Sequence, residues 1–253
     1  MTRIVDLPTP ALIVDRQKFD ANVATMAAVR PGLTLRPHIK AHKSTALAHE
    51  LAKVGHTAFT CATPREVIGM VQAGLGSDLL LANETVDPAR LRAMASLLNN
   101  SRITVAVDSD VTARMAAENG IKDVLIDVNV GMPRCGVLPD RAATLAAFAV
   151  SLGLNVRGVM GYEGHLMAVA DRDEQRAKVR SAMGVLVECF DQVRAQSGDD
   201  CTIISAGGTG TFDLYDPSDP LLARVNEVQA GSYALMDSHY GALELPFVQA
   251  LYV

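Results

Sequence analysis

The chain has 253 residues, of which 49% are hydrophobic and 20% charged, and its formal net charge is −5. This size and composition are typical of one globular domain with a large core, and the acidic balance argues against a nucleic-acid or anionic-membrane partner. Arg3, Asp6, Pro8 and Pro10 stand where a secretion signal needs an apolar run, and no apolar stretch is long enough to span a bilayer. We therefore expect a cytoplasmic protein without membrane segments.

Short β-forming runs alternate with helical stretches along the chain. We predict strands over 33–40, 56–61, 77–82, 102–107, 122–130, 155–162, 201–206 and 225–231. Amphipathic stretches lie between them, and several open on a Ser, Thr or Asp cap and close on Gly. Such alternation predicts parallel strands joined by crossover helices. A (β/α)8 TIM barrel fits best, and a doubly wound open sheet is the alternative.

Two further strand-like runs lie outside this alternation. PTPALIVD, residues 8–15, precedes the first helical stretch, and LPFVQALYV is the last run of the sequence. Neither has a partner strand in the predicted barrel. We assign 1–15 to an N-terminal strand segment, 16–244 to the barrel and 245–253 to the start of a C-terminal β domain that is absent from this chain. Alternatively, another chain supplies the partner strands.

The four cysteines, Cys61, Cys135, Cys189 and Cys201, are scattered along the chain. They form no CxxC pair and have no companion histidine at metal-ligand spacing. We interpret them as reduced thiols in or near the core. Cys135 is the exception to watch, because it lies inside a glycine-rich motif.

The stretch LRPHIKAHKS places Arg36, His38, Lys40 and His42 at every second position. In a strand these four side chains share one face. The C-terminal strand ends of a parallel barrel form the active site, so Lys40 would point into the barrel mouth with both histidines nearby. A lysine among other cations has a lowered pKa and a usable neutral amine. A polar, solvent-facing strand and a zinc site on the two histidines are the alternatives, although Pro37 disfavours the helix that a zinc pair needs.

Three more motifs follow later predicted strands. SAGGTGTF and AGSY come after the seventh and eighth strands, where barrels frequently hold a phosphate on glycine-rich backbone. NVGMPRCGV places Arg134 between two glycines after the fifth strand. GYEGHL follows the sixth strand, where Tyr162 and His165 could face the same barrel mouth. A reactive lysine, a pair of phosphate-binding loops and an arginine together favour a pyridoxal phosphate site.

These motifs resemble those of the fold-type III pyridoxal phosphate enzymes, whose N-terminal domain is the alanine racemase barrel. RPHIKAHKS is similar to the lysine motif of the D-threonine aldolase and D-serine dehydratase branch, and GMPRCG resembles the arginine motif shared across fold type III. SAGGTGT and GSYALMD are similar to the phosphate loops of that branch. The resemblance extends from TPALIVD to FVQALYV, which is nearly the whole chain.

The resemblance implies a role for each motif residue. Lys40 would form the Schiff base with pyridoxal 5'-phosphate, and His42 would be a second catalytic residue, with His38 beside it. Arg134 would contact the phenolic oxygen of the cofactor, and Tyr162 would lie near its ring. The phosphate would be held by residues of two loops: Gly207, Gly208, Thr209, Gly231, Ser232 and Tyr233.

The implied activity is that of a carbon-carbon lyase on a small D-β-hydroxy amino acid, such as D-threonine cleaved to glycine and acetaldehyde. Relatives carry a divalent metal (Mn, Mg or Zn) in their C-terminal domain, and no residue here matches its ligands. The same resemblance implies a homodimer. D-serine dehydratase, D-3-hydroxyaspartate aldolase and a non-catalytic role in pyridoxal phosphate homeostasis are the alternatives. A racemase is disfavoured because its second base belongs to the missing domain.

Overall fold

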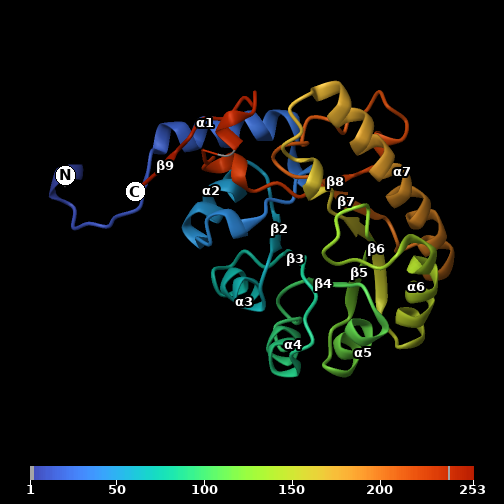
Figure 1. Ribbon diagram of the computed structural model, residues 1–253. Helices are drawn as coiled ribbons and strands as arrows, with labels where there is room; N and C mark the ends of the chain where they lie inside the picture. Colours follow the sequence, from blue (N-terminus) through green and yellow to red (C-terminus); the bar gives the residue numbers. More distant parts are fainter. Residues whose placement is uncertain (1–2, 239) are drawn as a thin grey trace.

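The computed structural model describes residues 3–238 and 240–253, whose central element is a parallel sheet surrounded by helices (Figure 1). The sheet has seven strands in the order β2-β3-β4-β5-β6-β7-β8. Their bounds are β2 Ala58–Cys61, β3 Asp78–Leu81, β4 Ile103–Val107, β5 Asp123–Asp127, β6 Asn155–Gly161, β7 Ile203–Ala206 and β8 Glu227–Val228. Because neighbouring strands are consecutive and parallel, each connection crosses over the outside of the sheet.

A short segment closes this sheet into a ring. Leu35 pairs in parallel with Val228 of β8, and His38 pairs in parallel with Thr60 of β2. Backbone hydrogen bonds of 2.8 and 3.0 Å join the segment to the same two strands. The predicted barrel of eight parallel segments is therefore confirmed, with residues 35–38 as the segment that joins the two edges.

The first predicted strand, over 33–40, is shorter in the structure. It is preceded by the 3-10 helix η2 (Gly32–Thr34) and followed by the 3-10 helix η3 (Ile39–Ala41). The side chain of His38 caps η3 by accepting a hydrogen bond from the Lys40 N–H at 3.4 Å. Strand alternation therefore stops within the motif, and the prediction that its four basic side chains share one face is wrong.

Helices cover the outside of the ring (Figure 1). They are α1 Arg16–Val29, α2 Thr45–Lys53, α3 Pro64–Gln72, α4 Pro88–Ala95, α5 Asp110–Glu118, α6 Ala142–Ser151 and α7 Arg172–Ser197. Most begin on a side chain that accepts a hydrogen bond from the first turn, as the capping pattern predicts: the caps are Asp15, Ser44, Thr63, Asp87, Ser109 and Asp171. None of the helices in the described ranges is long and apolar enough to cross a membrane.

The two terminal runs pair with each other. β1 (Ile13–Val14) and β9 (Leu251–Tyr252) form an antiparallel two-stranded sheet. Asn22 of α1 fastens the segment before β9, because its side chain donates to the Val248 carbonyl at 2.7 Å and accepts from the Val248 N–H at 2.9 Å. The expectation that both runs lack a partner strand is wrong. Their pairing joins opposite ends of the sequence, and no local pattern reveals it.

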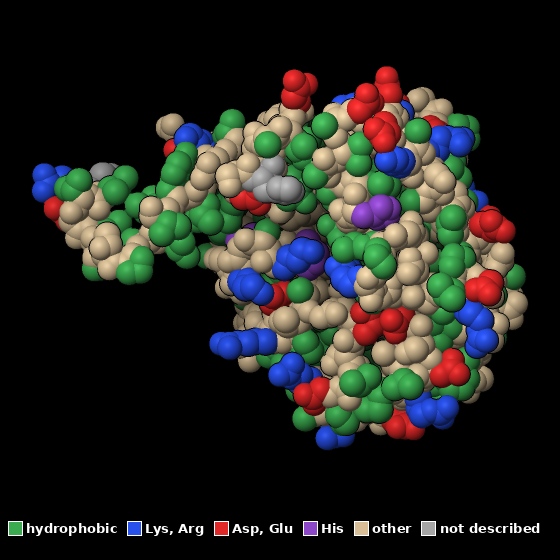
Figure 2. Space-filling view, viewed as in Figure 1, with side chains coloured by type: hydrophobic (Ala, Val, Ile, Leu, Met, Phe, Trp, Pro, Cys, Tyr) green, Lys and Arg blue, Asp and Glu red, His purple; other side chains and the backbone are tan. Residues whose placement is uncertain are grey.

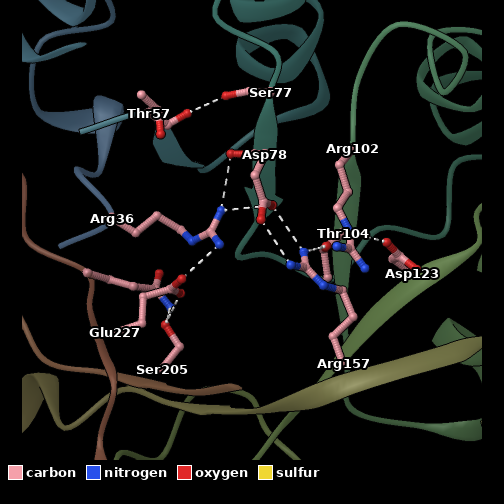
Figure 3. A network of polar contacts seen from close by, with 11 residues as sticks. Arg36, Thr57, Ser77, Asp78, Arg102, Thr104, Asp123, Arg157, Ser205 and Glu227 are labelled. Atoms are coloured by element: carbon pink, nitrogen blue, oxygen red, sulfur yellow. Dashed lines mark hydrogen bonds and ion pairs between the residues drawn. The ribbon is translucent and has the colours of Figure 1, made fainter. Parts of the chain in front are cut away.

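The interior of the ring is filled in layers. Its middle holds a small apolar layer formed by Leu80, Ala106, Leu125 and Met160. Toward the N-terminal strand ends, the buried Arg36 forms ion pairs with Asp78 and Glu227, and Arg157 pairs with the same Asp78 (Figure 3). The C-terminal strand ends, on the other side of the apolar layer, leave room for a cavity.

All four cysteines are free thiols, and Cys61, Cys189 and Cys201 are buried. Burial raises the pKa of Cys189 and of Cys201 to about 11. These thiols therefore stay protonated and unreactive at neutral pH. The prediction of reduced thiols in or near the core is confirmed.

Candidate active site

A cavity of about 300 Å³ opens at the C-terminal ends of the strands. Most of the predicted site residues line it: Lys40, Arg134, Tyr162, Gly207, Gly208, Thr209, Gly231 and Ser232. His38 lines it as well, whereas His42, His165 and Tyr233 lie outside its lining. Figure 2 shows Lys, Arg and His side chains gathered near the middle of one face of the molecule. The barrel thus brings most of the motif residues together in one place.

Lys40 and Arg134 both lie against the ring of Tyr162. The Lys40 Nζ is 5.5 Å from the ring centroid, and the Arg134 Cζ is 5.4 Å from it. Both distances are within the range of a cation–π contact. Burial, together with the positive charge of Arg134, lowers the pKa of Lys40. Lys40 therefore reaches its neutral, nucleophilic form more readily than an ordinary lysine does.

The two histidines that flank Lys40 are held neutral. Burial lowers the pKa of His38 to about 3 and that of His42 to about 4. In each ring Nδ1 accepts a backbone hydrogen bond, from Lys40 at 3.4 Å and from Ser44 at 3.0 Å, so Nε2 carries the proton. Neither histidine belongs to a group of metal-ligating side chains in the described part of the chain, which leaves the zinc alternative without support.

We expect the free energy of unfolding to fall as the pH drops from about 6.5 toward 4. The pKa of His42 is about 4 in the folded chain against an ordinary value of 6.5, so the unfolded chain binds more protons in this window. The slope approaches about 1.4 kcal/mol per pH unit for each such group. His42→Gln should flatten the curve in chemical denaturation across this pH range, and the same change at exposed His49 should leave it as it is. An equal slope in His42→Gln would contradict the assignment.

The loop after β7 is shaped by its glycines and is tied to the loop after β8. Gly207 has φ +86°, the left-handed region that favours glycine, and a Cβ on Gly208 would come within 2.7 Å of the Met167 sulfur. The Thr209 hydroxyl oxygen accepts from the Tyr233 N–H at 3.0 Å, which leaves the hydroxyl proton available to a ligand. Tyr233 thus contributes its backbone to the junction of the loops. Its own buried hydroxyl has no partner among the described residues.

The carboxylate of Glu163 stabilises the loop after β7, and no sequence motif had predicted this role. The side chain is completely buried. Its carboxylate accepts from the Gly207 N–H at 3.1 Å, from the Thr211 hydroxyl at 2.8 Å and from the Tyr215 hydroxyl at 2.5 Å. A buried carboxylate needs such donors, and in satisfying it they fix the conformation of the loop. The available signal was a lone glutamate between a buried strand and a glycine turn in GYEGHL.

A second group was also missed, because its members come from three separate segments. Glu84, Asp127 and Cys135 place one ligand atom each within 4.8 Å of one another. The Cys135 thiol donates to the Asp127 carboxylate at 3.4 Å. Burial and the neighbouring carboxylate of Glu84 raise the pKa of Asp127, so this carboxyl group takes up a proton more readily than an ordinary aspartate. Glu84 and Cys135 line the cavity together with Arg134.

Comparison with known proteins identifies the family. The family model for the alanine racemase N-terminal domain matches residues 14–239. The chain belongs to the alanine racemase N-terminal domain family. A solved family structure, D-threonine aldolase from Filomicrobium marinum, superposes with a TM-score of 0.89 and 34% identity, covering 99% of this chain and 70% of the other. The family expected from the motifs is thus confirmed.

Two curated relatives of the alanine racemase N-terminal domain family extend the comparison. D-threonine aldolase of an Arthrobacter species is 36% identical over 97% of this chain and 66% of its own length. 3-Hydroxy-D-aspartate aldolase of Paracoccus denitrificans (strain Pd 1222) is 28% identical over 94% of this chain and 63% of its own length. The chain therefore spans slightly less than two thirds of these relatives.

Proposed function

We propose that this chain is the cofactor-binding barrel of a pyridoxal 5'-phosphate-dependent lyase that cleaves D-β-hydroxy amino acids, with D-threonine giving glycine and acetaldehyde. The observation that carries the proposal is the meeting of Lys40, whose pKa is lowered, with Arg134 and the Thr209 loop around one cavity. The 36% identity to a D-threonine aldolase supports this substrate class.

The cavity fits a phosphorylated aldehyde with an aromatic ring. Lys40 supplies the amine, and the loops after β7 and β8 supply backbone N–H groups and hydroxyls for the phosphate. A Cβ on Gly231 would lie 2.3 Å from the His38 carbonyl oxygen, so only glycine brings the backbone this close. When bound, pyridoxal phosphate supplies an electron sink for the carbanion left by bond cleavage.

The remaining chemistry belongs to side chains of this chain. Arg134 places a fixed positive charge beside Lys40, where it can hold an anionic oxygen of the ligand. Tyr162 offers a flat face for stacking. Because its pKa is lowered, Lys40 can hold or return a proton at Nζ near neutral pH. The His38 Nδ1 accepts a hydrogen bond from the Lys40 backbone N–H and so fixes the turn from which the lysine projects.

The test is incubation of the 253-residue protein with pyridoxal phosphate, Mn²⁺ and D-threonine. We expect glycine and acetaldehyde in equal amounts, and none from L-threonine. Pyruvate from D-serine would indicate a dehydratase instead, and glyoxylate from D-3-hydroxyaspartate would indicate the aldolase for that substrate. Cofactor binding without product from any of these amino acids would contradict lyase activity of these 253 residues and favour a cofactor-carrying role for them.

A further inference from the structure

Two loops that line the cavity lie against each other. The loop after β6 begins at Tyr162, and the loop after β7 carries Thr209. Because β6 and β7 are neighbours in the sheet, both loops leave it side by side. A Cβ on Gly208 would lie 3.6 Å from Cε2 of Tyr162, and a Cβ on Gly210 would lie 2.2 Å from the Met167 carbonyl oxygen. Glycine at these two positions therefore lets the loops pack closely.

The side chain of Gln175, in the first turn of α7, joins the two loops. The residue is 1% exposed, and its Nε2 lies 2.7 Å from the Leu166 carbonyl oxygen in the loop after β6. The same nitrogen lies 3.4 Å from the Met167 carbonyl oxygen and 3.2 Å from the Gly210 carbonyl oxygen in the loop after β7. One buried NH₂ group thus serves both loops, and the function proposed above assigns no role to it.

Arg172 fixes the orientation of the Gln175 amide. Its guanidinium donates to Gln175 Oε1, so the NH₂ group of the amide faces the two loops. Arg172 also donates to the Gly210 carbonyl oxygen at 3.1 Å and pairs with both carboxylate oxygens of Asp213, at 2.7 and 2.6 Å. The start of α7 therefore holds the loop after β7 through two side chains.

A second connection lies nearer the strand ends. Glu163, in the loop after β6, accepts from the Gly207 N–H and from the Thr211 hydroxyl of the loop after β7. With Gln175 at one place and Glu163 at the other, the two loops form one unit. A ligand that orders one loop then also orders the other, and a second ligand loses less conformational entropy on binding. An anion on the loop after β7 should therefore steady the Tyr162 ring.

We propose that Gln175 is a positioning residue that couples the two loops, so that an anion bound by the loop after β7 raises the affinity of the cavity for an aromatic aldehyde beside Tyr162. The inference rests on the proposed function, in which the anion and the aldehyde are the phosphate and the pyridoxal part of one ligand. Through this coupling the phosphate contributes more to affinity than its own contacts do. The site accordingly discriminates against aldehydes that lack it.

The experiment supplies the two parts of the ligand separately. Equilibrium binding of pyridoxal, which lacks the phosphate, is followed by absorbance with and without saturating inorganic phosphate. We expect phosphate to tighten pyridoxal binding to the wild-type protein by about fivefold, the lower end of typical couplings between sites. Hydrogen exchange should show that phosphate alone slows exchange of the backbone amides of residues 164–170, which belong to the loop after β6.

Three variants assign the coupling. Gln175→Met keeps the length of the side chain without its donor, and it should reduce the coupling to less than about twofold and abolish the effect of phosphate on residues 164–170. Arg172→Ala removes the group that orients the amide, and should lower the coupling by about twofold. Arg172 is 40% exposed in its side chain, so this variant is expected to fold.

Val193→Ala is the matched control. Val193 is buried in the same helix, about 27 Å from Gln175 along the helix axis, and its apolar side chain donates to neither loop. This variant should lose stability in thermal unfolding but keep the coupling. The coupling is a ratio of two affinities of one protein, so a general loss of stability does not change it.

A coupling that persists in folded Gln175→Met, or that is lost equally in Val193→Ala, would overturn the role of Gln175. If Gln175→Met does not fold, wild-type coupling in Arg172→Ala overturns it instead. Pyridoxal binding that ignores phosphate in the wild-type protein would refute the coupling, while binding of pyridoxal phosphate itself leaves the proposed function standing. A wild-type protein that binds no pyridoxal phosphate would remove both.

Discussion

Replacing Lys40 with alanine is expected to abolish the visible absorption that pyridoxal phosphate gains on binding, and to reduce glycine release from D-threonine by about 10³-fold or more. The lysine is the amine that meets the Arg134 side chain and the Tyr162 ring at the cavity. No other lysine lines this cavity in the described ranges. A difference spectrum of each protein with added cofactor measures the first effect, and a discontinuous assay of glycine measures the second.

Lys43→Ala is the control for Lys40→Ala. Lys43 lies three residues away and is exposed, and its Nζ forms an ion pair with Glu66 at 2.7 Å outside the cavity. We expect this variant to keep both the absorption band and the activity. An absorption band that survives in Lys40→Ala but is lost in Lys43→Ala would move the reactive amine to the second lysine.

Glu163→Ala is expected to lower the free energy of unfolding by about 3 kcal/mol and to weaken cofactor binding by about tenfold or more. The substitution leaves the Gly207 N–H and the hydroxyls of Thr211 and Tyr215 without their buried acceptor. The loop that carries Thr209 then loses the contact that shapes it. Urea denaturation gives the first quantity, and a cofactor titration followed by absorbance gives the second.

Two further variants separate the parts of this effect. Tyr215→Phe removes one of the three donors and should cost about 1–2 kcal/mol. Glu163→Gln keeps the volume but places an amide NH₂ among donors, so it should cost more than Tyr215→Phe. Wild-type stability and affinity in Glu163→Ala would show that the loop holds its shape without the carboxylate.

The strands of the barrel were largely predictable, because both faces of each strand are covered and the residues read as continuous apolar runs. ITVAV at 103–107 and LLL at 79–81 are examples, and both lie in observed strands. The strand predicted over 33–40 was too long at its C-terminal end, because the alternating basic pattern continues through the 3-10 helix that carries Lys40. The pairing of β1 with β9 could not be predicted from local sequence patterns, because the two segments lie at opposite ends of the sequence.

The cavity residues divide in a similar way. Lys40, Arg134 and the glycine loops stand in compact motifs, so their spacing pointed to one chemistry. Glu163, which holds the loop after β7, is a single polar residue in a buried segment and has no motif of its own.

Closure of the ring through residues 35–38 has a consequence for how the protein is made. The cavity combines Lys40 from the first segment with Gly231 from beyond the last strand, so it cannot exist on the ribosome until β8 has emerged. Until then residues 35–38 lack their pairing with β8 and expose unpaired backbone, a state prone to association with other chains. Contacts this distant in sequence also form slowly. A ligand that binds only the closed ring shifts the folding equilibrium toward the closed form. If pyridoxal phosphate is that ligand, as the proposed function requires, its supply during synthesis should govern the yield of native protein.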